Sequence, residues 1–279
     1  MQRSIALLPF LSMPSPFVAG FLVVIIGHLL LCTVLQFGFY RWRSDQPEQW
    51  KVQPKKAQNL QGGVPEQWWV PLLGLLLGRK KPGRHPRHNL FATFNVFMAS
   101  TFAGKVSDLI ATGRSTVYWD GDAWQLWPIV VGFALSMTWQ CVCEYYWHRR
   151  ELMHLSIFYA RLHKYHHFYK SPEPFDDLMI HPLEAFGYFV LLYSPSFLFR
   201  MPVASFAAYM AVCGICGVLD HTGIALSIPG LYDTTDHDRH HSRFEVNYAF
   251  PFPVMDILHG TYDGKFLGTQ HSTCGRTRS

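Results

Sequence analysis

The chain has 279 residues, of which 49% are hydrophobic, 16% aromatic and only 15% charged. Soluble domains usually carry about 25% charged residues, so the composition argues against an ordinary soluble globule. A mean hydropathy of +0.06 nevertheless predicts that much of the chain lies outside a bilayer. The net charge of +5 is modest and spread along the chain, which disfavours a nucleic-acid-binding protein with one basic face.

The first half of the sequence predicts membrane helices joined by a basic loop. Residues 17–40 form an apolar run about as long as a bilayer core requires, and they lack the cleavage pattern of a secretory signal. Residues 41–90 are polar and basic, with a short apolar segment at 68–77 that suits the membrane interface. Residues 90–111 are moderately apolar, and 124–147 form a further predicted span with aromatic residues at both ends.

Basic residues predict the orientation of these spans. Positively charged loops tend to stay in the cytoplasm, so the 41–90 loop and the arginine pair 149–150 are both expected there. Two shorter apolar runs between 185 and 219, divided near 200–202, would return the chain to the side where it started. We therefore expect the histidines before and after this hairpin to share one site that faces the cytosol.

Single cysteines and histidines inside the apolar runs are expected to pack. The six cysteines show no disulfide spacing. Cys213 and Cys216 lie among small residues, which favours close helix packing over a redox or zinc pair. His28 is a lone polar residue in the first span, and we expect it to be packed or interfacial rather than a metal ligand.

Histidines form the main chemical signal. Eleven of the fifteen fall between His148 and His259, and eight of these form groups at 148–154, 163–167 and 237–241. The last two groups both read H-x-x-H-H. On a helix the first histidine of this pattern shares a face with the following pair, while the adjacent pair diverges by about 100° and can reach two different metals. Imidazole suits iron, zinc and copper, and a shared metal would offset the cost of so many polar rings near a bilayer.

Carboxylates stand beside several of these histidines. Ligating histidines usually donate their second N–H to a carboxylate or a carbonyl, so such acids are candidates to orient the rings. Helix capping or solvation explains each of them equally well. The acids are Glu144, Asp220, Asp236 and Asp238.

Together these motifs resemble the fatty acid hydroxylase/sterol desaturase superfamily. The resemblance covers roughly residues 140–265, and residues 1–120 carry no comparable signature. The motifs are Tyr146-Trp147-His148-Arg149, His154, His163-x-x-His166-His167, His181-Pro182-Leu183-Glu184, His221, His237-x-x-His240-His241, Asn247-Tyr248, Asp256 and Gly260-Thr261.

The resemblance implies an all-α, integral membrane helical bundle of about four spans. A cytosolic helical cap would hold a histidine-rich di-metal site, generally two iron ions, in the endoplasmic reticulum membrane. We expect residues 1–120 to form membrane helices and the basic loop, 121–265 the catalytic domain, and 266–279 a flexible tail. The implied metal ligands are His148, His154, His163, His166, His167, His221, His237, His240 and His241, with His181 as a further candidate.

The first histidine pair departs from the family pattern. Five residues separate His148 from His154, where three or four are usual, so on a regular helix the two would point about 120° apart. A π-bulge or a helix break near Arg150 would bring them together. Otherwise one of the two is not a ligand, and Glu144 or Glu151 substitutes for it.

The implied activity is oxidation of a lipid by dioxygen and two electrons. We expect hydroxylation of an unactivated C–H bond in a sterol or fatty acyl lipid, with desaturation or sterol methyl oxidation as the alternatives within the family. The sequence has no nucleotide-binding glycine fingerprint, so a separate donor of the cytochrome b5/reductase type is expected. Outside this class stand a zinc-dependent membrane hydrolase, which would use a metal-activated water, and a non-catalytic metal-binding membrane protein.

Overall fold

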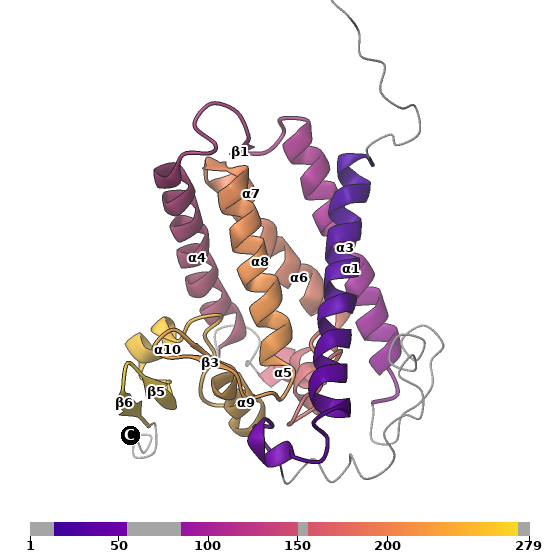
Figure 1. Cartoon of the computed structure of the whole chain (residues 1–279), viewed down its shortest axis with the longest axis vertical. Coiled ribbons are helices and arrows are strands. Elements are labelled where there is room, and N and C mark those ends of the chain that lie inside the picture. Colours follow the sequence, from indigo (N-terminus) through magenta and orange to yellow (C-terminus); the bar gives the residue numbers. More distant parts are fainter. Residues whose placement is uncertain (1–13, 55–84, 150–155, 273–279) are drawn as a thin grey trace, which may run out of the picture.

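The structure, a computed structural model, describes residues 14–54, 85–149 and 156–272. In Figure 1 a bundle of long helices stands above a cap of shorter elements. The bundle consists of α1 (Pro16–Leu35), α3 (His88–Ala111), α4 (Leu126–His148), α6 (Pro182–Tyr193) and α8 (Val203–Asp220). The expectation of an all-helical membrane bundle with a helical cap is confirmed at this level, because the described strands form only short two-stranded pairs.

Short elements build the cap end. A π-helical turn, η1 (Gln36–Arg41), extends α1 and leads to η2 (Pro47–Gln49). The remaining cap elements are α5 (Ser156–Arg161), η4 (His163–Phe168), α9 (Thr234–Arg243), α10 (Val254–His259), and the hairpins of β3 (Ser227–Ile228) with β4 (Tyr232–Asp233) and β5 (Gly264–Phe266) with β6 (Thr269–His271).

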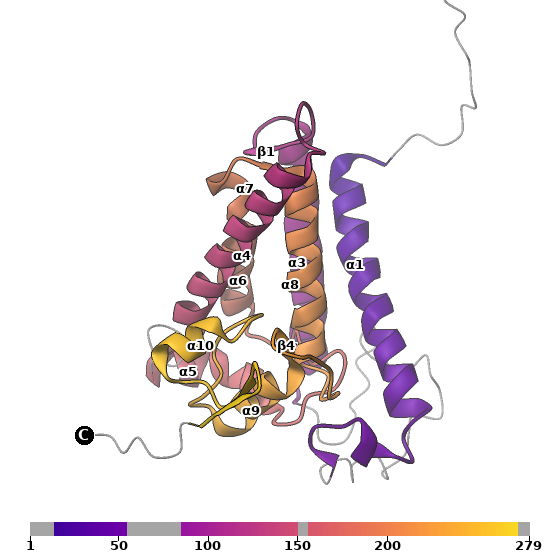
Figure 2. The same cartoon turned by 60° about the vertical axis from the view of Figure 1, so that its left-hand side comes forward.

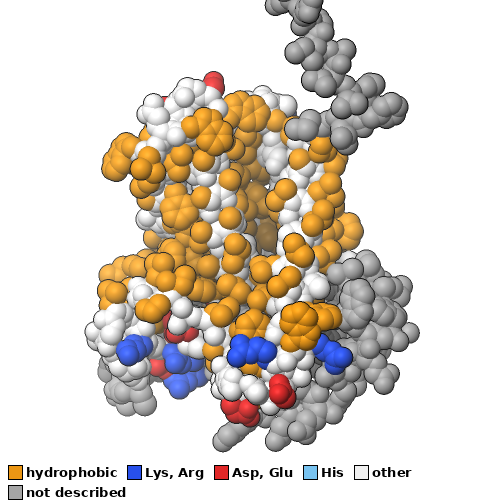
Figure 3. All heavy atoms as spheres, viewed as in Figure 1, with side chains coloured by type: hydrophobic (Ala, Val, Ile, Leu, Met, Phe, Trp, Pro, Cys, Tyr) orange, Lys and Arg blue, Asp and Glu red, His pale blue; other side chains and the backbone are white. Residues whose placement is uncertain are grey.

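Three described helices are long and apolar enough to cross a membrane: Pro16–Arg41, Leu126–His148 and Val203–Asp220. The helix α6 is apolar but has only 12 residues, and α3, which runs along α1, does not reach the same apolarity. Apolar side chains cover the bundle in Figure 3, whereas Lys and Arg gather at the cap end on that face. The expected number of about four spans remains a prediction.

Small residues let α1 and α3 approach each other closely. A Cβ on Gly20 would lie 2.7 Å from the backbone oxygen of Ala103, and one on Gly104 would lie 2.7 Å from that of Phe17. Neither position can accept a side chain without movement of the backbone. Figure 2 shows α1 at the edge of the bundle beside α3 and α8, so these contacts fix its place there.

The last two bundle helices form the return hairpin expected from the sequence. The chain leaves the cap through α6, turns at α7 (Pro195–Leu198), and passes through β2 (Met201–Pro202) into α8. The strand β2 pairs with β1 (Val117–Tyr118), which holds this turn against the α3–α4 connection at the end away from the cap. The chain therefore returns to the cap, and the segments before α6 and after α8 meet there.

Several expectations concern residues at the margins of the described chain. The interfacial segment 68–77 and the histidine at position 154 lie outside the described residues. Strand β6 lies inside the stretch expected to be a tail, because Leu267 and Gly268 adopt positive φ angles of 46° and 82° and turn the chain back on β5.

Candidate metal centre

Two helices of the bundle each have a histidine at the cap end. His148 is the last residue of α4, and His221 directly follows α8 as its C-terminal cap. Arg149 is extended (φ −69°, ψ −176°), so the helix ends before the predicted break near position 150. The angle of about 120° between His148 and His154 assumed one continuous helix, and α4 ends at His148, so that angle does not apply.

Eight buried histidines form two groups at this end. In each group the four ligand nitrogens lie within 4.8 Å of one another. The first group, here the α4 cluster, contains His148, His163, His167 and His240. The second, here the α8 cluster, contains His166, His221, His237 and His241.

The two H-x-x-H-H segments interlock between the clusters. The segment on η4 gives His163 and His167, four residues apart, to the α4 cluster, with their Nε2 atoms 2.8 Å from each other. The segment on α9 gives His237 and His241 to the α8 cluster, with Nε2 atoms 3.2 Å apart. The remaining histidine of each segment joins the opposite cluster, so adjacent histidines diverge as their spacing predicts.

Backbone carbonyls orient four of these eight rings. A carbonyl oxygen only accepts hydrogen bonds, so the Nδ1 atom beside it carries the proton and Nε2 keeps a lone pair. The Nδ1 donors and their acceptors are His148 to Tyr248 O at 3.0 Å, His240 to Val246 O at 2.8 Å, His221 to Gly217 O at 2.7 Å and His241 to Tyr169 O at 3.1 Å.

The electrostatics of the α8 cluster favour a cation at its centre. The Nε2 atom of His221 lies 3.1 Å from that of His166 and 2.9 Å from that of His237. Burial, and then the other imidazoles, lowers the pKa of His166 and of His237 well below the ordinary value, so both rings stay neutral. Nitrogens about 2.0–2.1 Å from one metal ion lie roughly 3 Å apart, so this donor set fits a bound transition metal.

Glu184 is a site residue that reasoning from the histidines alone missed. Its Oε1 lies 2.5 Å from Nδ1 of His163, and both side chains are buried. The glutamate stands in the first turn of α6, within the segment 181–184 that belongs to the family pattern. That His-Pro-x-Glu pattern was the available signal for it.

The acids expected to orient histidines accept hydrogen bonds from other groups. Glu144 accepts from Gln140 at 3.1 Å, Asp220 from Tyr232 at 2.6 Å, Asp236 from Tyr262 at 2.8 Å, and Asp238 from Gln53 at 2.5 Å. The orienting role expected for Glu144, Asp220 and Asp236 is therefore wrong for the described contacts. The segment after α9 supplies two of the carbonyls that orient rings instead, those of Val246 and Tyr248.

The motifs after α9 build that segment. Asp256 accepts from the backbone N–H groups of Tyr248 at 3.0 Å and Ala249 at 2.6 Å, and from the Thr261 hydroxyl at 2.6 Å. Asn247 has a positive φ of 55° and exchanges hydrogen bonds with the backbone of Asp263. These contacts aim the Tyr248 carbonyl at His148, which explains the Asn-Tyr, Asp and Gly-Thr motifs physically.

The structure does not bring His181 into either cluster. Its Nδ1 accepts from the backbone N–H of Leu183 at 3.2 Å and caps the N-terminus of α6. Its ring lies against Phe91 and Tyr165, with centroids 5.6 and 5.7 Å away.

The chain that follows α1 closes the loop after His221. Val52 N–H donates to Gly223 O at 3.0 Å, and Ala225 N–H donates to Trp50 O at 2.7 Å. The Gln53 amide reaches Asp238 on α9. Residues 50–53 carry no sequence motif, yet they contact the chain on both sides of the α8 cluster, after His221 and on α9.

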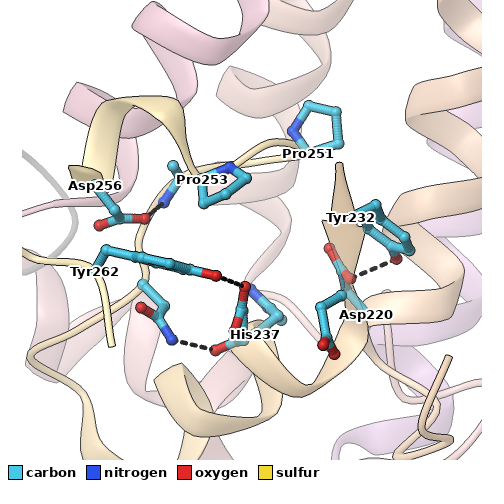
Figure 4. A pocket seen from close by; sticks show the side chains of 11 residues that line it. Asp220, Tyr232, His237, Pro251, Pro253, Asp256 and Tyr262 are labelled. Carbon is cyan, nitrogen blue, oxygen red and sulfur yellow. Dashed lines mark hydrogen bonds between the residues drawn. The ribbon is translucent and has the colours of Figure 1, made fainter. Parts of the chain in front are cut away.

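A small cavity with both polar and apolar lining residues lies beside the α8 cluster (Figure 4). It measures about 20 Å³, room for about one water, and His237, Asp220 and Asp236 are among its lining residues. Burial raises the pKa of Asp236 to about 7, and the hydrogen bond from Tyr262 opposes this rise. Asp220 and Asp236 therefore lie on the cavity side of the α8 cluster.

The chain is similar in sequence to a sterol desaturase, a lathosterol oxidase and an aldehyde decarbonylase. The chain is 33% identical to a Delta(7)-sterol 5(6)-desaturase of Gibberella zeae over 138 residues, 49% of this chain and 39% of the relative. It is 28% identical to the lathosterol oxidase of Homo sapiens over 121 residues, 42% of this chain and 40% of the relative. It is 30% identical to a very-long-chain aldehyde decarbonylase of Arabidopsis thaliana over 172 residues, 56% of this chain and 26% of the relative. No solved structure matches the chain.

The fold and the histidine clusters define a helical membrane protein with a candidate metal centre. The fatty acid hydroxylase family matches residues 133–261, which include both clusters, so this part of the chain is similar to the fatty acid hydroxylase/sterol desaturase superfamily. The chain spans at most 40% of the length of each of the three relatives.

Proposed function

We propose that this chain is a membrane-bound di-iron oxygenase that hydroxylates an unactivated C–H bond of a sterol or fatty acyl lipid. Dioxygen, two electrons and two protons convert the C–H bond to an alcohol and release one water. The interlocking of the α4 and α8 clusters supports the proposal best, because each H-x-x-H-H segment contributes to both. An alkyl C–H bond offers side chains no acid, base or electrophile, so bound iron supplies the oxidising chemistry.

In the proposed centre the α4 cluster holds one ion and the α8 cluster the other. Nδ1 contacts keep five of the eight rings in one tautomer, four of them through backbone carbonyls such as Tyr248 O and the fifth, that of His163, through Glu184. His154 is proposed as an additional ligand beside the α4 cluster. His181 is left out of the proposed set because it caps α6.

The position of the clusters suits a substrate that arrives from the bilayer. His148 and His221 end helices that are long and apolar enough to cross a membrane, so both clusters border the bundle. All eight histidines of the clusters are buried, which keeps bulk water away from the reacting bond. A lipid tail can then reach the centre without its polar end leaving the interface.

We propose a cytosolic orientation in the endoplasmic reticulum membrane and an electron donor of the cytochrome b5/reductase type. Arg41 in η1, Arg87 before α3 and Arg149 after α4 lie at the cap end, which agrees with the tendency of basic segments to remain cytosolic. An acidic carrier would meet complementary charge at this end. Turnover that is unchanged after charge reversal at Arg161 and Lys164 would contradict docking there.

Desaturation is a second candidate, favoured by the similarity to a sterol desaturase. It uses the same dioxygen and electrons but removes two hydrogens and releases two waters. The two reactions differ in the fate of oxygen. Supply of ¹⁸O₂ labels the product of hydroxylation and leaves that of desaturation unlabelled.

The test is iron analysis of the purified chain together with lipid profiling of cells with and without it. We expect iron in the protein and a new oxygenated lipid that requires dioxygen and reductant and disappears in the His166→Ala variant. Product formation without oxygen or reductant would indicate the zinc hydrolase instead. Absence of both iron and any oxygenated or desaturated product would overturn the proposal.

A further inference from the structure

A third group of ligand-type side chains lies apart from the two clusters, between α1 and the loop that precedes α6. Its members are His28 and Cys32, one turn apart on α1, and Asp177. One ligand atom from each lies within 4.8 Å of the others. The first two residues precede the family domain at 133–261, so the group joins two parts of the chain.

The distances suit a shared cation. Cys32 Sγ is 3.8 Å from His28 Nε2, and Asp177 Oδ2 is 3.5 Å from His28 Nδ1. Ligands of one tetrahedral zinc ion, at about 2.0 Å for nitrogen and 2.3 Å for sulfur, lie roughly 3.5 Å apart. The two distances end on different nitrogens of His28, and one ion binds only one of them. With one ligand atom taken from each residue, the three atoms lie within 4.8 Å of one another, a separation that a bound ion would shorten.

Burial of these three side chains without a bound cation costs free energy. Cys32 is fully buried, and the side chains of His28 and Asp177 are 10% and 9% exposed. The Oδ1 atom of Asp177 is buried without a hydrogen-bond partner. A carboxylate oxygen in this position requires a proton or a cation to compensate for the lost water.

A simple ion pair between His28 and Asp177 explains less. Its 3.5 Å separation exceeds that of a good N–H···O hydrogen bond. It also leaves Oδ1 of Asp177 without a partner, and the contact of the Cys32 sulfur with Nε2, at 3.8 Å, is at most a weak hydrogen bond. One cation satisfies all three side chains.

We propose that His28, Cys32 and Asp177 bind one divalent transition-metal ion of the zinc type. The donor set of imidazole, thiolate and carboxylate is one that zinc accepts. This proposal differs from the expectation that His28 is only packed or interfacial. The bound metal connects α1 to the catalytic domain. The same loop sends Asp176 to within 3.8 Å of His88 at the start of α3, so it contacts both N-terminal helices.

The metal is a structural one, separate from the chemistry of the histidine clusters. Neither cluster contains a cysteine among its described members. A thiolate bound to Co²⁺ gives a charge-transfer absorption that all-histidine ligation lacks. The sulfur of Cys32 therefore provides a signal specific to this site.

The experiment loads the full-length protein in detergent with Co²⁺. We expect a thiolate-to-cobalt charge-transfer band in the wild type, its loss in Cys32→Ser and its retention in Cys143→Ser, a matched change at a half-buried cysteine of α4. Zinc titration should show one binding equivalent fewer in Asp177→Asn, with affinity reduced at least tenfold. The His28→Gln variant provides an independent loss of the band if the Cys32 variant does not fold.

Absence of the band in the wild type, or its persistence in Cys32→Ser, would overturn the proposal. An unchanged zinc stoichiometry in Asp177→Asn would do the same. Iron content and lipid oxidation report on the α4 and α8 clusters alone. The proposed zinc-type site can therefore be refuted without affecting the proposed function, and the proposed function can be refuted without affecting this site.

Discussion

The Oε1 atom of Glu184 lies 2.5 Å from Nδ1 of His163, although the two residues are 21 positions apart in the chain. The contact joins α6 of the bundle to η4 of the cap. It makes the α4 cluster depend on the return hairpin, which carries no cluster histidine until it ends at His221.

Glu184→Gln should weaken metal binding at the α4 cluster. The amide cannot supply the negative charge that strengthens the N–H donor of His163, and loss of such a partner typically lowers metal affinity about 10–100-fold. Iron titration of the purified protein measures this. The matched control is Glu48→Gln, at an exposed position in η2, which should retain wild-type affinity.

Asp256→Asn should loosen the segment that orients His148. One carboxylate oxygen that accepts from the N–H of Ala249 or Tyr248 becomes an NH₂ group, which cannot accept. We expect a loss of about 1–3 kcal/mol in the free energy of unfolding, together with weaker iron binding. Thermal unfolding in detergent and metal analysis check both effects, and an unchanged melting temperature would contradict this account.

His166→Ala and His167→Ala should each remove a ligand from a different cluster. The two residues are adjacent, but the first belongs to the α8 cluster and the second to the α4 cluster. Each variant should lose about one of the two proposed iron equivalents, and the iron that remains should differ spectroscopically between them. His181→Asn, which retains a side chain able to cap α6, should keep full iron content. Identical spectra from the two alanine variants would refute the interlocked arrangement.

The metal-free protein should become less stable as the pH falls below about 6.5. Burial lowers the pKa of His166, His167, His237 and His241 well below the ordinary value, so the unfolded chain binds protons first. Stability therefore rises with pH between the folded and unfolded pKa values, and is lost as the pH falls through that window. Denaturant unfolding from pH 7.5 to 5 measures this, and a flat profile would contradict it.

Gly20→Ala should disturb the crossing of α1 with α3. The added Cβ would lie 2.7 Å from the carbonyl oxygen of Ala103, so the backbones must separate. We expect a destabilisation of about 1–3 kcal/mol, measured by thermal unfolding in detergent. Gly27→Ala on the same helix meets no atom within 4 Å and serves as the control. Equal melting temperatures for the two variants would mean that the crossing is not tightly packed.

Local spacing determined much of this protein in advance. The apolar runs became α1, α4 and α8 because a bilayer-length stretch of apolar residues forms its hydrogen bonds within a helix. The spacing of the H-x-x-H-H segments predicted that the two adjacent histidines separate, because helical geometry depends on neighbouring residues. It did not predict which of the two stays with the first histidine, since i+3 and i+4 share its face.

Only the tertiary structure decided which partners complete each cluster. The sequence placed Asp220 and Asp236 beside histidines, yet the Tyr248 carbonyl and Glu184 orient the rings, because the folded backbone brings distant groups closer than adjacent side chains can turn. His28 is likewise a residue whose partners the sequence does not reveal, because it stands there as a lone polar residue. The fold places it beside Asp177, 149 positions further along the chain, and this contact makes it a candidate ligand.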